Sequence, residues 1–477
     1  MNEPGTPADR RCGSVDGTAA PWRGNGGYQR LCAAVTVSEI GDWLLFIALP
    51  LYVLRASGSA LATSTVFLAE LIPAVVVGTV CGPLIDRWNP GRLLAALTGL
   101  QSLVVLPLLW VGPGSLWIVY AVAAIQAAFT SLTTPAQQAV VPLIVDPDQI
   151  SGANAMVEMA SNAARLIGSP LGGALLPTLG LRGLVIGDAA TFLVSAALLV
   201  WPGRASSRAE STPPPATTGR WTAIADGWHA ARASATLRAA LAISFIAAVA
   251  QGLFLVLFVL FVLRSLHAGD QLVGVLRGVQ AVGGVLGGLL IGTWAKQLRA
   301  RTQAVWGLAS FALISALCWN SPAFTTASWW YIVLFVAVGV PATALSSGLI
   351  TGTQQASPRR LRGRVLSLLG VAQALGQASG ILAAGLLSAV APLTVLLNLQ
   401  AGCYLTCAFL AIMRFDRPRA KLLPSSAPPL SEGGARDGSD CDSGDDAEWG
   451  REAAGAGDSG GEDAEGEWRI GRGPVRA

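Results

Sequence analysis

Long apolar stretches separated by short breaks constrain this chain more than any other feature. A window of roughly 20 apolar residues can cross the hydrocarbon core of a bilayer as a helix. Only 13% of the residues are charged, about half the share found in soluble proteins. We therefore predict an all-α membrane protein with twelve spans, at 31–54, 60–83, 91–112, 115–137, 152–178, 181–201, 238–264, 272–295, 303–321, 328–352, 363–388 and 392–414.

The breaks between the spans alternate in charge. VGPGS at 111–115 is uncharged, whereas KQLRAR at 296–301 and RRLRGR at 359–364 are basic. The basic set of breaks and the span-flanking ends together hold 22 Lys and Arg, and the opposite side holds three. Because Lys and Arg next to spans are retained in the cytoplasm, we predict a multi-pass plasma-membrane protein with both termini in the cytoplasm.

Composition divides the chain into five segments. Residues 1–30 are polar and lack the apolar core of a signal peptide, so we predict a disordered cytoplasmic N-terminus. Residues 31–201 and 238–414 should form two six-helix halves. Residues 202–237 should be a cytoplasmic linker that ends in a short amphipathic helix. Residues 415–477 should be a disordered cytoplasmic tail, which from residue 432 carries 13 acidic residues and five Arg.

Six spans, a loop and six further spans resemble the layout of the major facilitator superfamily. The stretch GPLIDRWNPGRLL, between spans two and three, is similar to a signature of that family. It contains an apparent insertion, Asn89-Pro90, between its two halves. The matching positions are Gly82, Asp86, Arg87, Gly91 and Arg92.

Two further stretches resemble one branch of that family. They are PAQQAVVPLIVDPDQISGANAMVEMASNAARLIGSPLGGALL at 135–176 and TQQASPRRLRGRVLSLLG at 353–370. The branch is the twelve-span drug-efflux group, which includes macrolide and siderophore exporters. The resemblance covers about residues 30–415. It implies two pseudo-symmetric halves of six transmembrane helices each.

The resemblance also implies a cytoplasmic latch between the halves. In the family, span eleven lies across the interface from the signature stretch. Here span eleven begins with RRLRGRVLS, and its positive dipole end together with Arg362 and Arg364 should attract Asp86. Such a contact can hold the cytoplasmic side closed and release it when the halves rock. Alternatively, Arg87 and Arg92 only set the topology and Asp86 is a partner at a helix end.

Two carboxylates lie inside span one. Glu39 and Asp42 are three residues apart, which places them on one helix face. Two carboxylates on a poorly hydrated face repel each other, so one should carry a proton near neutral pH. This is the property that a proton antiporter needs, and Glu39 is our first choice. Alternatively, Asp42 lies near a wet vestibule and stays ionised.

Span five carries Glu158 and Arg165, seven residues apart along one face. A buried Arg is costly unless it is paired, so Arg165 should face either the central cavity or a carboxylate. We interpret the pair as belonging to the substrate or proton path, and a purely structural ion pair is the alternative. Weaker candidates are Glu70, Arg277, Asp188 (expected to act mainly in helix packing), Gln126, Gln251, Asn162 and Gln373.

The sequence does not contain the motifs that several other classes of function require. No GK[ST] phosphate loop occurs, so transport should use an ion gradient rather than ATP. The two His are too few for a metal site, and no pairing of nucleophile and base points to an enzyme. The basic loops follow from topology and lipid headgroups, so nucleic acid is not needed as a partner. We expect no cofactor, and partners limited to a small-molecule substrate, protons and the bilayer.

The sequence therefore predicts a monomeric, proton-coupled exporter of amphipathic small molecules, such as drugs or a secondary metabolite. One alternative is a dedicated exporter of a siderophore or another natural product. A second alternative is a membrane sensor or assembly factor that transports nothing and uses the acidic tail as an interaction arm. The fold alone does not separate these functions.

Overall fold

The computed structural model describes residues 25–80, 88–112, 114–200, 228–229, 232, 234–293, 298–358 and 361–414. Eleven helices in these ranges are long and apolar enough to cross a membrane. The first half of the chain contains α1 (Gly26–Ser57), α2 (Ala60–Val80), α4 (Pro90–Val104), α5 (Leu116–Ile144) and α6 (Ile150–Leu199). The second half contains α8 (Ala235–Leu260), α9 (Asp270–Thr293), α10 (Ala300–Asn320), α11 (Ser328–Ala356), α12 (Arg362–Leu387) and α13 (Leu393–Arg414).

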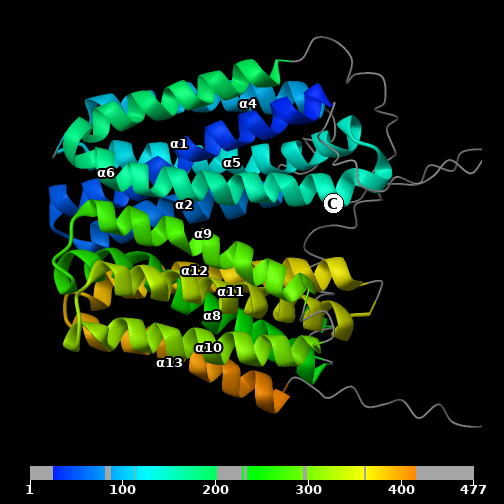
Figure 1. Cartoon of the computed structure of the whole chain (residues 1–477), viewed down its shortest axis with the longest axis vertical. Coiled ribbons are helices and arrows are strands. Elements are labelled where there is room, and N and C mark those ends of the chain that lie inside the picture. The colour runs from blue at the N-terminus through cyan, green and yellow to red at the C-terminus, as the bar shows by residue number, and fades with distance from the viewer. Residues whose placement is uncertain are drawn as a thin grey trace, which may run out of the picture. The chain divides into compact units, whose positions relative to one another are not determined.

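Short helices extend two of these elements. The 3₁₀ turn Leu106–Trp110 follows α4, and the π-helical turn Phe261–Ser265 continues α8. The helices lie roughly side by side, so that connections fall at the two ends of the bundle (Figure 1). All of these elements belong to one compact unit, Met1–Arg419.

Helix α6 consists of two arms. Its 50 residues would span about 75 Å as a straight helix, more than twice the hydrocarbon thickness of about 30 Å. Gly180 interrupts it with φ 65° and ψ 178°, a backbone conformation that favours glycine. The ribbon reverses direction at this point (Figure 1). The arms, 150–179 and 181–199, correspond to the predicted fifth and sixth spans.

Two segments predicted to lie outside the spans are helical where the structure describes them. Helix α1 begins at Gly26, within the 1–30 segment predicted to be disordered, because the Asn25 side chain accepts hydrogen bonds from the amides of Gly27 and Tyr28. Helix α8 begins at Ala235, within the predicted 202–237 linker. Most of that linker, residues 1–24 and residues 415–477 lie outside the described ranges.

Tyr28 anchors the first turn of α1 to the first arm of α6. Its side chain is buried, and its hydroxyl donates a 2.8 Å hydrogen bond to the Ala153 carbonyl. Tyr28→Phe should lower the free energy of unfolding by about 1 kcal/mol, because the carbonyl loses a buried donor. Denaturant unfolding of the purified protein measures this, with Tyr52→Phe as the control. An equal effect of both substitutions would contradict an anchoring role for the Tyr28 hydroxyl.

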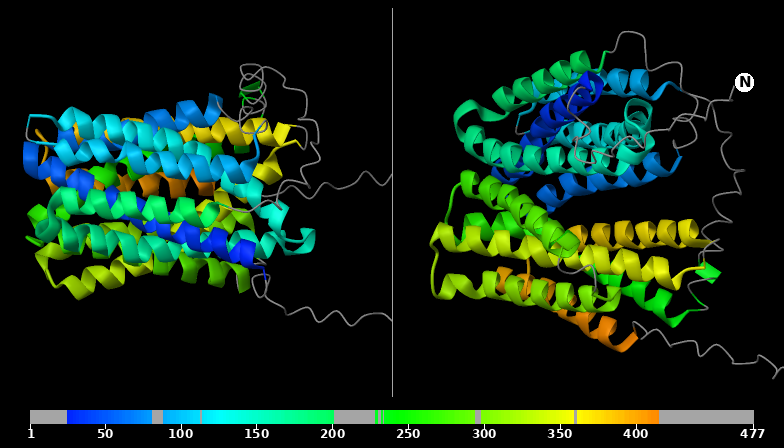
Figure 2. Two further views of the ribbon diagram at one scale, coloured as in Figure 1. Left: turned by 90° about the horizontal axis from the view of Figure 1, so that it is seen from above. Right: turned by 45° about the vertical axis from the view of Figure 1, so that its right-hand side comes forward.

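The two halves of the bundle converge at one end, which we call the Gly58 end because the α1–α2 connection lies there. Near this end, Gly385 of α12 packs against Ser64 of α2, so closely that an added Cβ would lie 2.4 Å from the Ser64 Oγ. The helices of the two halves diverge toward the opposite end, where α4 and α12 begin (Figure 2). We call this the Asn89 end.

Glycines also bring α6 and α9 together on the Gly58 side of the bundle. A Cβ on Gly274 would lie 2.2 Å from the Ser169 carbonyl oxygen, and one on Gly173 would lie 2.3 Å from the Asp270 carbonyl oxygen. Small residues let helix backbones approach this closely within a membrane. The α6 glycine run GSPLGG therefore forms part of the contact between the halves.

Candidate functional site

Four acidic side chains line one cavity of about 480 Å³ in the first half of the chain. Glu39 and Asp42 come from α1, Glu70 from α2 and Asp188 from the second arm of α6. We call this the acidic cavity. Its other lining residues are apolar or uncharged: Trp43, Leu45, Phe46, Leu49, Ala74, Val105, Val122, Ala123, Gln126, Ala127, Thr130, Ser131 and Thr134.

Asp188 is fully buried against α1. Its carboxyl group occupies the space that Gly41 leaves open, since a Cβ on Gly41 would lie 2.2 Å from Asp188 Oδ1. Neither carboxyl oxygen has a hydrogen-bond partner within the described part of the chain. The contact with Gly41 fits the helix-packing role expected for Asp188. Its place in the acidic cavity adds a buried carboxyl group whose ionised form would be costly.

Glu39 lies where the acidic cavity meets a second, more polar one. Its Oε1 accepts a 2.7 Å hydrogen bond from the Ser161 hydroxyl. Together with Trp43 and Thr134, Glu39 also lines a neighbouring cavity of about 640 Å³. We call this second space the mouth cavity; its remaining lining residues are Gln137, Gln138, Asn154, Val157, Glu158, Ser161, Asn162 and Arg165. Glu39 therefore connects the two spaces, and Asp42 lies on the acidic-cavity side.

Arg165 reaches across to the second half of the chain. Its Nε donates to the Arg277 carbonyl at 3.2 Å, and its Nη2 donates to Gln280 Oε1 at 2.7 Å. Glu158 is exposed, and the described residues show no ion pair between it and Arg165. Arg165 lines the mouth cavity, and the side-chain hydrogen bonds described for it go to α9. Its part in a substrate or proton path stays a prediction.

Arg277 belongs to the same cluster. Its side chain is 7% exposed, and its Nη1 donates to the same Gln280 oxygen at 3.1 Å. Both guanidinium groups also lie over aromatic rings: Arg165 is 4.9 Å from the Trp43 ring centroid and Arg277 is 5.2 Å from that of Phe254. We call Arg165, Arg277 and Gln280 the arginine cluster. Sequence reasoning ranked Arg277 low and did not identify Gln280.

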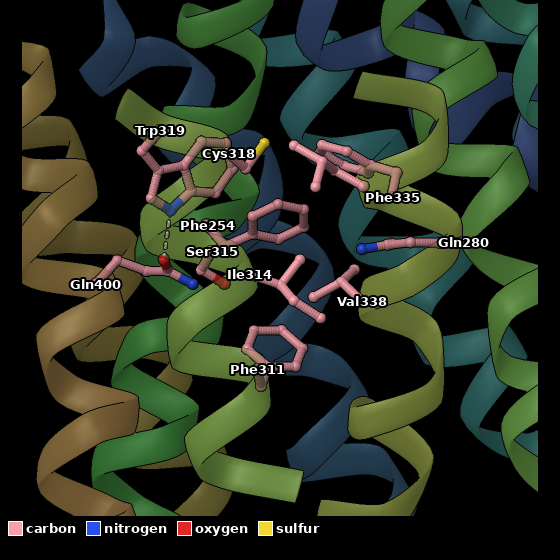
Figure 3. Close-up of a pocket in the computed structure, with 11 residues that line it drawn as sticks. Phe254, Gln280, Phe311, Ile314, Ser315, Cys318, Trp319, Phe335, Val338 and Gln400 are labelled. Carbon is pink, nitrogen blue, oxygen red and sulfur yellow. Dashed lines mark hydrogen bonds between the residues drawn. The ribbon is translucent and has the colours of Figure 1, made fainter. Parts of the chain in front are cut away.

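An aromatic pocket lies on the other side of Gln280 (Figure 3). Phe254, Trp319 and Phe335 form much of its wall, and Trp319 Nε1 donates a 2.9 Å hydrogen bond to Gln400 Oε1. The amide nitrogen of Gln280 points into this space from the opposite side (Figure 3). Sequence reasoning missed this pocket, because its residues come from five helices and share no motif.

The predicted latch residues fall into two groups. Gly82, Asp86 and Arg87 lie outside the described residues. The other members are at helix starts: Gly91 and Arg92 in α4, and Arg362 and Arg364 in α12, where Arg362 is exposed and Arg364 is half-buried. The latch itself stays a prediction.

The apparent insertion Asn89-Pro90 has a structural role at the start of α4. The Asn89 side chain accepts hydrogen bonds from the Gly91 and Arg92 amides, at 3.1 and 3.2 Å. Pro90 is the first helical residue, a position that needs no amide donor. Together they cap the helix that carries the second half of the signature.

An ion pair joins the halves at the Gly58 end. Arg55, in the last turn of α1, lies 2.7 Å from the carboxylate of Asp270, in the first turn of α9. The Asp270 side chain is fully buried, whereas that of Arg55 is about half exposed at 51%. Solvent therefore screens the pair, and we expect a contribution of no more than about 1 kcal/mol.

Asp270→Asn should make the Gly58 end open more often. A loss of about 1 kcal/mol corresponds to a roughly fivefold change in the population ratio. A cysteine at Ser64, which is buried near the contact between the halves, would report opening through its rate of thiol labelling. Arg182→Gln, which removes an exposed charge from the same end, is the control. Labelling that is unchanged in Asp270→Asn would show that the ion pair does not hold this end closed.

Comparisons with known proteins agree on one family. The family model described as Major Facilitator Superfamily matches residues 31–250 and 240–449. An uncharacterised MFS-type transporter of Bacillus subtilis (strain 168), YfiS, is 27% identical over 207 residues, which are 43% of this chain and 49% of that protein. The chain thus spans about half the length, or less, of the curated relatives it matches.

Solved structures share the fold at low sequence identity. A bacterial homologue of the iron transporter ferroportin, in an inward-facing state, has a TM-score of 0.63 at 15% identity, covering 82% of this chain and 99% of that one. The POT family transporter PepTSo has a TM-score of 0.67 at 11% identity, covering 82% of this chain and 97% of that one. At these identities the likeness establishes the fold alone.

Proposed function

The chain belongs to the major facilitator superfamily, and from this premise we propose that it is a secondary active transporter that exports amphipathic small molecules by proton antiport. One observation carries the proposal. Four carboxyl groups gather in a cavity whose other walls are apolar or uncharged. Ionisable groups at membrane depth are costly and tend to mark ion or substrate paths.

The multi-pass architecture supports a specific topology. If each arm of α6 crosses the bilayer once, the eleven apolar helices make twelve crossings in two halves of six. The excess of Lys and Arg in one set of loops then assigns the Asn89 end to the cytoplasm and the Gly58 end to the outside. Both termini are cytoplasmic in this topology, and the membrane is the plasma membrane.

The position of the contacts between the halves supports alternating access. Glycine packing and the Arg55–Asp270 pair hold the halves together near the Gly58 end, whereas the helices diverge toward the Asn89 end. This form therefore represents a carrier closed to the outside and open to the cytoplasm. A substrate enters from the cytoplasm through the mouth cavity, and rocking of the halves presents it to the outside.

Coupling follows from the cost of buried charge. When the cavity is closed without substrate, the protonated form of an acidic group has the lower free energy, because an unpaired buried carboxylate is costly. A substrate with a positive group near Glu39 and Asp42 stabilises their ionised forms and displaces one proton into the cytoplasm. After the substrate leaves on the outside, a proton from that side neutralises the carboxylate and allows the return step.

Transport by the purified protein in proteoliposomes tests this proposal. A panel of fluorescent amphiphilic amines, some with and some without a carboxylate, is supplied, and a pH gradient is imposed without ATP. We expect the gradient to drive accumulation of at least one compound, and nigericin, which collapses the gradient, to abolish that accumulation. Accumulation that ignores the gradient would contradict proton antiport. Transport of no compound in the panel would favour the sensor or assembly role.

A further inference from the structure

The two guanidinium groups of the arginine cluster share one uncharged oxygen. Gln280 Oε1 lies 2.7 Å from Arg165 Nη2 and 3.1 Å from Arg277 Nη1. The described residues place no carboxylate within ion-pair distance of either arginine. A buried cation is stabilised mainly by an anion, and an amide dipole replaces one only in part. The cluster thus carries two positive charges at the junction of the halves without a matching negative charge.

We propose that Arg165 and Arg277 bind an anionic oxygen of the transported molecule, at the position that Gln280 Oε1 now occupies. An oxygen within hydrogen-bond distance of both guanidinium groups marks where a carboxylate oxygen would be placed. This proposal rests on the transporter function proposed above and narrows the substrate class. The substrate is a zwitterionic amphiphile, with its basic group toward the acidic cavity and its carboxylate on the arginine cluster.

The mouth cavity gives an anion access to Arg165, whereas Arg277 and Gln280 do not line it. Arg165 lines the mouth cavity, whose lining also includes Glu39 and Trp43 of the acidic cavity. A molecule in the mouth cavity can therefore contact a carboxylate and a guanidinium group at the same time. The Trp43 ring centroid lies 4.9 Å from the Arg165 guanidinium group and places an apolar surface beside it; a charge-assisted hydrogen bond is stronger next to such a surface than in bulk water.

Gln280 borders the aromatic pocket, a small space of about 20 Å³ that is roughly the room of one water molecule. Its amide nitrogen already points into the aromatic pocket, between the walls formed by Phe335 and Phe254 (Figure 3). Rotation of the Gln280 side chain farther toward Ser315 or Gln400, which also line this pocket, requires these lining side chains to shift with it, and would free the position between the guanidinium groups. Gln280 thus acts as an internal neutral substitute that a substrate carboxylate displaces.

The substrate carboxylate would also connect the two halves. Arg165 belongs to α6 and Arg277 to α9, which come from opposite halves of the chain. A carboxylate bound by both arginines therefore gives a stronger contact between the halves than the present one through Gln280. Differential binding of this kind is what allows a ligand to bias a conformational equilibrium.

A matched pair of compounds tests the proposal. Ciprofloxacin carries a basic amine and a free carboxylate, and its methyl ester keeps the amine and lacks the carboxylate charge. Equilibrium dialysis at pH 7.5 against the full chain in lipid nanodiscs measures the binding of each. Because hydrogen bonds to charged groups are stronger than neutral ones, we expect the wild type to prefer the acid by about tenfold.

Gln280→Glu is the decisive variant, because it keeps the shape of the side chain and supplies a tethered carboxylate. We expect this variant to lose the preference for the acid, to within about twofold, while it still binds the ester. Arg277→Lys keeps the positive charge but removes the planar guanidinium group. It should therefore lower the preference for the acid over the ester in part. Arg264→Gln, which removes an exposed arginine elsewhere, should leave the preference unchanged.

Equal binding of the acid and the ester by the wild type, including binding of neither, would overturn the anion site. A preference for the acid that persists in Gln280→Glu would also overturn it, because the tethered carboxylate should fill the position. The pH-gradient experiment is independent of these results, since its panel holds amines with and without a carboxylate and its readout is the response to the gradient. Failure of the anion site is therefore distinguishable from failure of proton-coupled export.

Discussion

Glu39→Gln is expected to abolish uphill export while leaving downhill exchange of substrate across the membrane intact. Glu39 lies at the boundary between the mouth cavity and the acidic cavity, where both water and substrate can reach it. Gln cannot release a proton, so the binding of substrate can no longer displace a proton from this position. It can still accept the Ser161 hydrogen bond, so the helix packing should survive.

Proteoliposomes with an imposed pH gradient separate coupling from binding. Wild-type protein should concentrate the substrate severalfold, whereas Glu39→Gln should reach only equal concentrations on both sides. Asp146→Asn is the control, because this carboxylate is exposed and lines neither cavity. If Glu39→Gln still concentrates substrate in response to the gradient, Glu39 is not the coupling group and Asp42→Asn should be examined next.

The helices were largely predictable because their signal is local. A bilayer requires about 20 apolar residues per crossing, and the described helices fall on the predicted stretches. Helix ends were less predictable, since they depend on caps and tertiary contacts. Asn25 extends α1 toward the N-terminus and Asn89 fixes the start of α4. The break at Gly180 is different: the predicted spans 152–178 and 181–201 already separate there, and the positive φ of Gly180 is the backbone conformation that turns the chain between the two arms of α6.

The site was predictable only where its members share one helix. Glu39 and Asp42 are three residues apart, so the helical period alone places them together, and both line the acidic cavity. Glu70 and Asp188 join them from helices distant in sequence, and no spacing rule relates them. Gln280 was not among the amides that the sequence singled out, because no spacing rule relates it to Arg165 in a distant helix. Its role follows from its two arginine partners.

Gly274→Leu is expected to prevent closure of the Gly58 end. Even a Cβ at this position would lie 2.2 Å from the Ser169 carbonyl oxygen and 3.0 Å from Pro170 Cα. Both of these are backbone atoms, which cannot rotate away as a side chain can. Overpacking typically costs 1–3 kcal/mol, and backbone clashes place this change at the upper end, about 3 kcal/mol. That cost would shift the balance between the two carrier forms more than a hundredfold.

Thiol labelling of a cysteine at Ser64 measures the expected shift. In Gly274→Leu the cysteine should label at least tenfold faster than in the parent, and uphill export should be lost because the carrier no longer closes to the outside. Gly288→Leu is the control on the same helix: nothing lies within 4 Å of its added Cβ, and the residue is exposed. Slow labelling with normal export in Gly274→Leu would mean that the halves do not separate at the α6–α9 contact during transport. In that case the glycines serve helix packing within a rigid junction, and the moving contact must be sought between α2 and α12.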